Sequence, residues 1–202
     1  MRSPKTCLVA AMLVFLAMAP IAVAKTGRSK PGASYPQALR KLDAELRIAI
    51  EQGPTALAHD VESSKEVCRE AMESQQSGDQ EGAERGWTTL AQIVKQVDLP
   101  VWRAIIATLR DAHSNAESIQ RTFSKQWRGE PLKVNRLNLG AVRTQHGIRQ
   151  FLAAIRKLEG AMDSWEQHDC AGAQQAIDAT NQASPPAVQA IEKGMAILKT
   201  LD

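Results

Sequence analysis

The chain has 202 residues, of which 44% are hydrophobic and 23% are charged. Both fractions are close to the averages for soluble globular proteins, so they exclude a disordered chain and a membrane protein with several spans. Aromatic residues make up only 4% of the chain. This low content argues against an all-β sandwich or barrel, because half-buried strands favour aromatic side chains.

The first 24 residues have the features of a secretory signal peptide. Two basic residues precede an apolar run from Cys7 to Met18, and a small-x-small triplet ends at Ala24. An uncleaved membrane anchor is the alternative, because Cys7 to Ala24 is 18 residues long. With cleavage, no stable membrane span remains, and we expect the protein in the periplasm or outside the cell.

Residues 25–37 are rich in Gly, Ser, Pro and Lys and predict a flexible linker. Residues 38–202 predict one domain, long enough to bury a stable core without a metal or a disulfide. Apolar residues recur there at three- and four-residue spacing, and no stretch alternates with a period of two. The predicted fold class is therefore all-α.

The first predicted helix carries Leu39, Leu42 and Leu46 and stops at residues 53–54, where Gly is followed by Pro. A second helix ends at residues 77–78. Capping aspartates then open two more helices, one at Asp79 and one at Asp98. The second of these has a proline in its first turn.

Residues 128–135 break the helical pattern and precede the longest predicted helix, which Asn135 opens. This helix has the clearest amphipathic stripe in the chain, from Ile148 to Trp165. Asp169 caps a short helix, and residues 184–186, Ser-Pro-Pro, begin the last one.

Residues 71–92 align with residues 161–182 at seven identical positions, which share an Asp-x-x-Gly-Ala motif. The aspartate would cap a helix and the small residues would allow close helix approach. The alignment predicts two related helical hairpins that turn at residues 77–79 and 167–169. The predicted architecture is four-helix-bundle-like, with extra short Pro-initiated helices.

After signal cleavage the chain holds 23 basic and 22 acidic residues, so nothing favours a nucleic-acid partner. Charge is nevertheless uneven: residues 103–157 hold 11 basic and 3 acidic residues, and residues 51–84 hold 9 acidic ones. The two segments could face each other, or the basic one could bind anionic lipid, lipopolysaccharide or cell-wall polymer. We expect an outward-facing basic cluster at Arg121, Lys125, Arg128 and Lys133.

The sequence lacks the common catalytic and cofactor motifs. It has no Cys-x-x-Cys-His for covalent haem, no Glu-x-x-His for a di-iron bundle, and no hydrolase or phosphate-loop motif. We therefore assign no cofactor. His113 and Glu117 could form half of a metal site, although the expected position of all four histidines is the surface: His59, His113, His146 and His168.

Two cysteines remain after cleavage, Cys68 and Cys170, and an oxidising compartment favours their pairing. Cys68 lies about 15 Å below its own hairpin turn, at 1.5 Å per residue, whereas Cys170 lies at the other turn. A disulfide therefore requires the hairpins to be staggered. The alternative is a free, reactive Cys170 thiol beside His168.

These observations predict an exported, non-enzymatic helical-bundle protein that binds an unknown protein or an anionic component of the bacterial envelope. The first alternative is a carrier of non-covalent haem or metal in the bundle core. The second is a thiol enzyme using Cys170 and His168, although the sequence supplies no third group to orient that pair.

Cleavage after Ala24 is the first testable prediction. Mass spectrometry of the exported protein should find Lys25 as its first residue, because the small-x-small triplet directly precedes it. Recovery of the chain with an intact Met1 in a membrane fraction would contradict cleavage.

Overall fold

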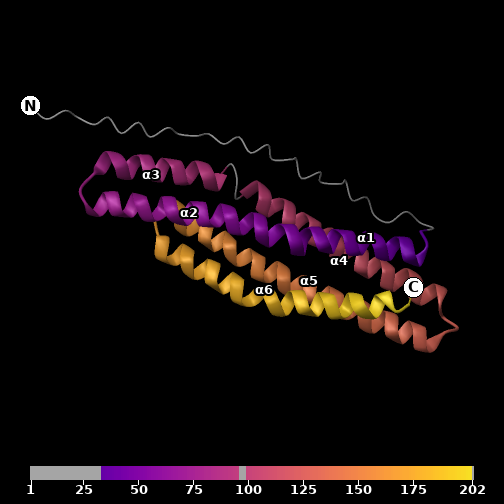
Figure 1. The fold of residues 1–202 in the computed structure, drawn as a ribbon. Helices are drawn as coiled ribbons and strands as arrows, with labels where there is room; N and C mark the ends of the chain where they lie inside the picture. The colour runs from indigo at the N-terminus through magenta and orange to yellow at the C-terminus, as the bar shows by residue number, and fades with distance from the viewer. Residues whose placement is uncertain (1–32, 96–98, 202) are drawn as a thin grey trace, which may run out of the picture.

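The computed structural model describes residues 33–95 and 99–201, which form six α-helices and no strand (Figure 1). The all-α prediction is confirmed. The signal peptide and the Asp98 cap lie outside the described residues. The helices are α1 (Tyr35–Arg47), α2 (Gly53–Gln76), α3 (Gln80–Ile93), α4 (Leu99–Gln126), α5 (Pro131–Glu166) and α6 (Cys170–Lys199), and a π-helix, η1 (Ile48–Gln52), joins α1 to α2.

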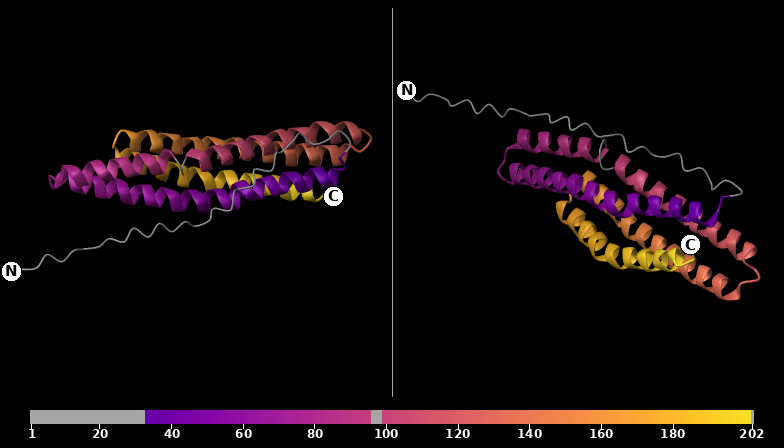
Figure 2. Two further views of the ribbon diagram at one scale, coloured as in Figure 1. Left: turned by 90° about the horizontal axis from the view of Figure 1, so that it is seen from above. Right: turned by 45° about the vertical axis from the view of Figure 1, so that its right-hand side comes forward.

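The helices combine into four antiparallel arms. The first arm is α1, η1 and α2, the second is α3 with α4, and α5 and α6 are the third and fourth (Figures 1 and 2). Each arm packs on the next along the chain, and α5 and α6 make the most extensive contact. The first and fourth arms touch at few points, so this side of the bundle is the least closed.

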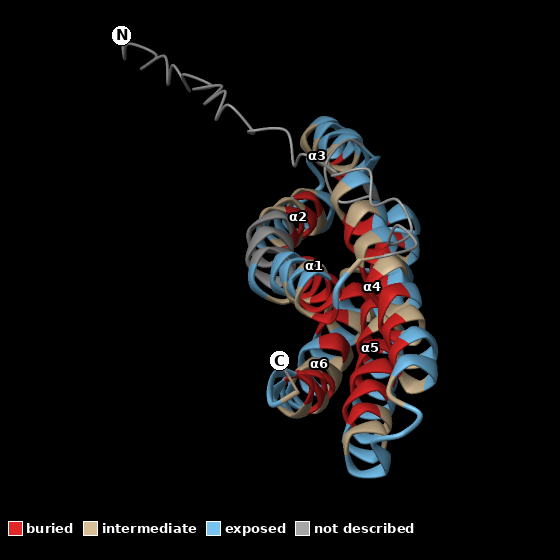
Figure 3. Cartoon of the chain, turned by 90° about the vertical axis from the view of Figure 1, so that its right-hand side faces the viewer, coloured by how far each residue is buried: buried red, intermediate tan, exposed pale blue. Residues whose placement is uncertain are grey.

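The predicted stripes form the core. Buried residues line the facing sides of the helices (Figure 3). In α4 they include Trp102, Leu109 and Phe123, and in α5 they include Phe151 and Trp165. Apolar burial of this kind is the main favourable term in folding.

The two predicted hairpin turns are confirmed at residues 77–79 and 167–169, and their geometry is shared. Asp79 Oδ1 and Asp169 Oδ1 each accept a hydrogen bond of 2.9 Å from the main-chain N–H three residues later, at Gly82 and Gly172. The residue before each aspartate has a positive φ, 82° at Gly78 and 61° at His168. The shared motif thus specifies the same turn twice.

The close contact of α5 with α6 depends on glycines that face the partner backbone. A Cβ on Gly194 would lie 2.6 Å from the Thr144 main-chain nitrogen, and one on Gly147 would lie 2.7 Å from that of Ile191. These distances are shorter than real Cβ contacts, so larger residues would push the helices apart. The third and fourth arms therefore behave as one closely packed pair.

A buried polar pair fixes α1 on α4. Asn115 Nδ2 donates to Glu45 Oε1 at 2.8 Å and to Glu45 Oε2 at 2.6 Å, and both residues are buried. Burial raises the pKa of the Glu45 carboxyl, and the Asn115 hydrogen bond and nearby Lys41 act in the opposite direction. A charged group at this depth needs such partners, so the pair sets which residues of the two helices meet.

Neither residues 53–54 nor residues 184–186 separate two helices as predicted, whereas Pro100 lies in the first turn of α4 as predicted. Residues 53–54 are the first two residues of α2 and follow η1 without a break. Proline is tolerated at this position because the first turn of a helix does not need its N–H. Pro185 and Pro186 lie inside α6, and the preceding carbonyls that lose their usual donors belong to exposed residues, Asn181 and Gln182. Water can therefore replace the lost hydrogen bonds, and the helix bends instead of ending.

Two predicted boundaries were also wrong by a few residues. α1 begins at Tyr35, within the predicted linker, because the Tyr35 side chain is buried and its hydroxyl donates to the Leu198 carbonyl at 2.8 Å. α5 begins at Pro131 rather than Asn135, since proline is well suited to the first helical position.

Substituting either cap, Asp79→Ala or Asp169→Ala, is expected to lower the free energy of unfolding by about 1 kcal/mol. Each change removes the acceptor for one N–H at a helix start. Urea denaturation measures the effect, with Asp163→Ala as the control, because Asp163 is an exposed aspartate within α5. A cap variant as stable as this control would contradict the proposed role.

Candidate functional site

The predicted basic cluster lies at the turn between α4 and α5. Arg121, Lys125 and Arg128 are exposed, and Lys133 is partly buried. Arg121 pairs with Glu117 at 2.9 Å, and Lys133 lies 3.7 Å from Glu130 and over the Trp127 ring, 4.2 Å from its centroid. Within the described ranges, Lys125 and Arg128 form no ion pair. Three of the four cations are thus exposed, and two of these three form no ion pair among the described residues.

The first half of α5 adds apolar side chains to this charged surface. Leu132, Leu139 and Val142 are 79%, 53% and 51% exposed and lie on the same helix. Exposed arginines are interspersed with them at helical spacing. We call this surface the basic apolar face, and it comprises Arg128, Leu132, Arg136, Leu139, Val142 and Arg143.

This face is exposed because α5 extends beyond its partner. A Cβ on Gly140 would meet the side chain of Leu198, at the end of α6, so residues 131–139 project past α6 (Figure 1). On the inner side, Tyr35, Phe123 and Trp127 support the projecting end, with ring centroids 4.8–5.4 Å apart. The projecting end is rigidly held although its outer side is open.

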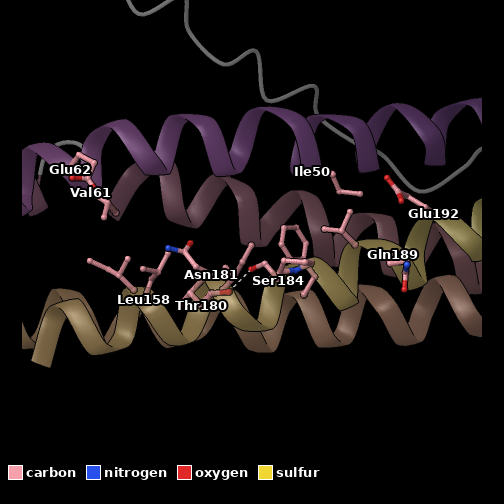
Figure 4. Close-up of a pocket in the computed structure, with 14 residues that line it drawn as sticks. Ile50, Val61, Glu62, Leu158, Thr180, Asn181, Ser184, Gln189 and Glu192 are labelled. Atoms are coloured by element: carbon pink, nitrogen blue, oxygen red, sulfur yellow. Dashed lines mark hydrogen bonds between the residues drawn. The ribbon is translucent and has the colours of Figure 1, made fainter.

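A second feature is an open cleft of about 570 Å³ between α2 and α6, lined also by α5 and η1 (Figure 4). Its apolar walls come from Ile50 and Val61 on the first arm and from Phe151, Ile155 and Val188 on the last two arms. This volume lies in the range of small-molecule sites. We call it the α2–α6 cleft.

Helix irregularities border the α2–α6 cleft on both sides. Ile50 belongs to the π-helix, and Ser184 and Pro185 belong to the proline-interrupted part of α6. A π-helical turn widens a helix and a proline bends one, so neither arm follows a straight path here. The sparse contact between the first and fourth arms is consistent with this geometry.

The charged groups among the described residues that line the cleft are two carboxylates, Glu62 and Glu192. They lie toward opposite ends of it (Figure 4). Glu62 pairs with Lys65 at 2.8 Å, whereas Glu192 is exposed and also borders an adjoining cavity of about 270 Å³. The charged side chains that line the described part of the cleft are therefore carboxylates, one of them paired with Lys65, in contrast to the cations of the basic apolar face.

Cys68 and Cys170 lie at disulfide distance, with Sγ atoms 1.97 Å apart and Cα atoms 5.9 Å apart. The hairpins have the stagger that this pairing requires. The neighbouring His168 ring stacks on Trp87 of α3, with centroids 4.2 Å apart. Because Cys170 is bridged, the free thiol that the thiol-enzyme hypothesis needs is absent from this arrangement.

His113 lies 3.7 Å from Glu117, as their helical spacing predicts. His113 is partly buried rather than on the surface, and its Nε2 atom has no hydrogen-bond partner. His146 and His168 are exposed as predicted, and the His59 side chain lies outside the description. No group of three potential metal ligands from His, Cys, Asp and Glu occurs among the described residues.

Among the described residues, the acidic segment forms local ion pairs. The ion pairs of the acidic segment link residues within one helix, such as Glu62 with Lys65 and Glu81 with Arg85. Both pairs have the three- or four-residue spacing that brings side chains together on a helix surface. Local pairing of this kind leaves the basic residues of α5 available.

Leu132 was missed because residues 128–135 were interpreted as a break, and Leu139 and Val142 were missed because the helix predicted from Asn135 was described only by its buried stripe. The spacing of Leu132 from Leu139, outside the buried stripe, is the signal that could have identified them. The α2–α6 cleft was also missed, because its walls carry residues that were correctly assigned to the core.

No family model, curated protein or solved structure matches this chain. Over the described ranges, no helix is both long enough and apolar enough to span a bilayer.

Removing the disulfide with Cys68→Ala and Cys170→Ala together is expected to lower the free energy of unfolding by about 2–4 kcal/mol. The bridge joins residues 102 positions apart, so its loss releases a long loop in the unfolded chain. Urea denaturation with and without reductant measures the effect, and the double variant should not respond to reductant. A wild-type protein that is equally stable under both conditions would contradict the bridge.

Proposed function

We propose that this chain is an exported, non-catalytic binding protein that docks on an anionic component of the bacterial envelope. The observation that carries the proposal is the basic apolar face. Between Pro131 and Leu158, α5 holds six basic residues and no acidic one, and three large aliphatic side chains are exposed on its first half. Exposed apolar area of this kind marks interaction surfaces.

An anionic lipid surface fits both properties of this face. Lys and Arg side chains are attracted to anionic headgroups, contributing about 1 kcal/mol each near the surface. Leu132, Leu139 and Val142 can bury apolar area at the boundary of headgroups and acyl chains, as interfacial helices do. The long arginine side chains can extend to the headgroups while their stems cover apolar surface.

Substituting Arg121, Lys125, Arg128 and Lys133 by Gln is expected to weaken binding to anionic vesicles at least about tenfold, because two of these cations are unpaired. Flotation of the mature protein with phosphatidylglycerol-containing vesicles at low salt measures it. Wild-type binding should fall with added salt and be weak on phosphatidylcholine alone.

The matched control loses four cations from the first three helices: Arg47→Gln, Lys65→Gln, Arg69→Gln and Arg85→Gln. It has the same net charge as the cluster variant, so preserved binding by the control and lost binding by the cluster variant would support docking through the α4–α5 turn, where the basic cluster adjoins the basic apolar face. Equal binding by all three proteins would contradict it. Binding to lipopolysaccharide or peptidoglycan, without binding to vesicles, would replace the lipid by another envelope polymer.

A further inference from the structure

We infer that the α2–α6 cleft is a binding site for an elongated apolar molecule that carries an ammonium group. This site is separate from the basic apolar face and has the opposite charge. The inference rests on three properties of the cleft: its apolar walls, the hydrogen-bonding state of its polar groups, and the position of its carboxylates.

The walls make the cleft suitable for a hydrocarbon body. Ile50 and Val61 face Phe151, Ile155 and Val188 across it. Transfer of apolar area from water into such a site contributes about 25 cal/mol per Å². A molecule without an apolar body would gain little from these walls.

The hydroxyl groups in the cleft already use their protons. The Thr180 hydroxyl lies within hydrogen-bond distance of two main-chain carbonyls, 2.9 Å from that of Ala176 and 3.2 Å from that of Ala154. The Ser184 hydroxyl donates to the Thr180 carbonyl at 2.8 Å (Figure 4). These oxygens can therefore accept hydrogen bonds from a ligand but have no spare proton to donate. A ligand with N–H donors matches these two hydroxyl groups, and the Asn181 and Gln189 amides that also line the cleft can accept from it as well.

Glu62 and Glu192 select the sign of the ligand charge. They lie toward opposite ends of the cleft, and no Lys, Arg or His occurs among the described residues that line it. An ammonium group at one end of an apolar chain can thus approach a carboxylate while the chain remains between the walls. A fatty-acid carboxylate would instead be repelled at the Glu192 end, whereas Lys65 already pairs with Glu62 at the other end.

Isothermal titration calorimetry of the mature protein with two probes of equal chain length tests this inference. The probes are dodecylammonium and laurate, used at low salt and below micelle formation. We expect dodecylammonium to bind at least about tenfold more tightly than laurate, which corresponds to about 1.4 kcal/mol. Comparable affinities for the two probes, or no binding of either, would overturn the inference.

Two test variants, each with a matched control, determine whether the probe binds in the cleft. Glu62→Gln with Glu192→Gln should reduce the preference for dodecylammonium, whereas Glu70→Gln with Glu166→Gln, two exposed carboxylates outside the cleft, should preserve it. Val188→Phe should weaken binding of dodecylammonium at least about tenfold by filling the cleft. Ala107→Phe, at an exposed position on α4, controls for added apolar area. Unchanged binding in the Val188→Phe protein, with its helical spectrum intact, would place the ligand elsewhere.

Discussion

The stagger between the two helical hairpins, held by the link from Cys68 to Cys170, determines which surfaces of this protein are open. Cys170 begins α6 at the second turn, whereas Cys68 lies well before the first turn. The tip of α2 and α3 therefore extends past the second hairpin, and the opposite end of α4 and α5 extends past α6 (Figures 1 and 2). An in-register bundle would cover more of both ends.

Packing between the arms is unequal around the bundle, and this determines where open volume lies. The third and fourth arms approach so closely that Gly147 and Gly194 have no room for a side chain. The two helices therefore cannot move apart without losing contacts between their main chains. The first arm instead meets α6 across a π-helix and two internal prolines. Open volume thus collects on the side where both helices depart from regular geometry, which is the side of the α2–α6 cleft.

Sequence predicted the local features of the fold well because they depend on neighbouring residues. The caps at Asp79 and Asp169 and the buried stripe from Ile148 to Trp165 follow from spacing alone. Pro185 was misinterpreted because a proline at a helix start and one inside a bent helix look alike in sequence. Their difference depends on whether the preceding carbonyls can reach water, which only the fold decides.

The candidate surfaces were harder to predict, because exposure of a side chain depends on where a distant helix ends. Leu132 is an ordinary core residue by type, and it is exposed because α6 stops near Gly140. The basic cluster was accessible to sequence reasoning since four cations around one turn have few local partners. The cleft was not, because its walls come from three arms of the bundle.

The acidic residues of α2 and the basic residues of α5 differ in how far nearby opposite charges compensate them. In α2, acids and bases alternate at three- and four-residue spacing, so Glu62 and Glu73 find cations on their own helix. In α5, the nearest acids to Arg136, Arg143 and Arg149 along the chain are Glu130 and Glu159, beyond the reach of a helical turn. Their mutual repulsion costs stability in the free protein. An anionic partner would remove that cost on binding, which is why the uncompensated charge of α5, rather than the total charge of the chain, supports the envelope-binding proposal.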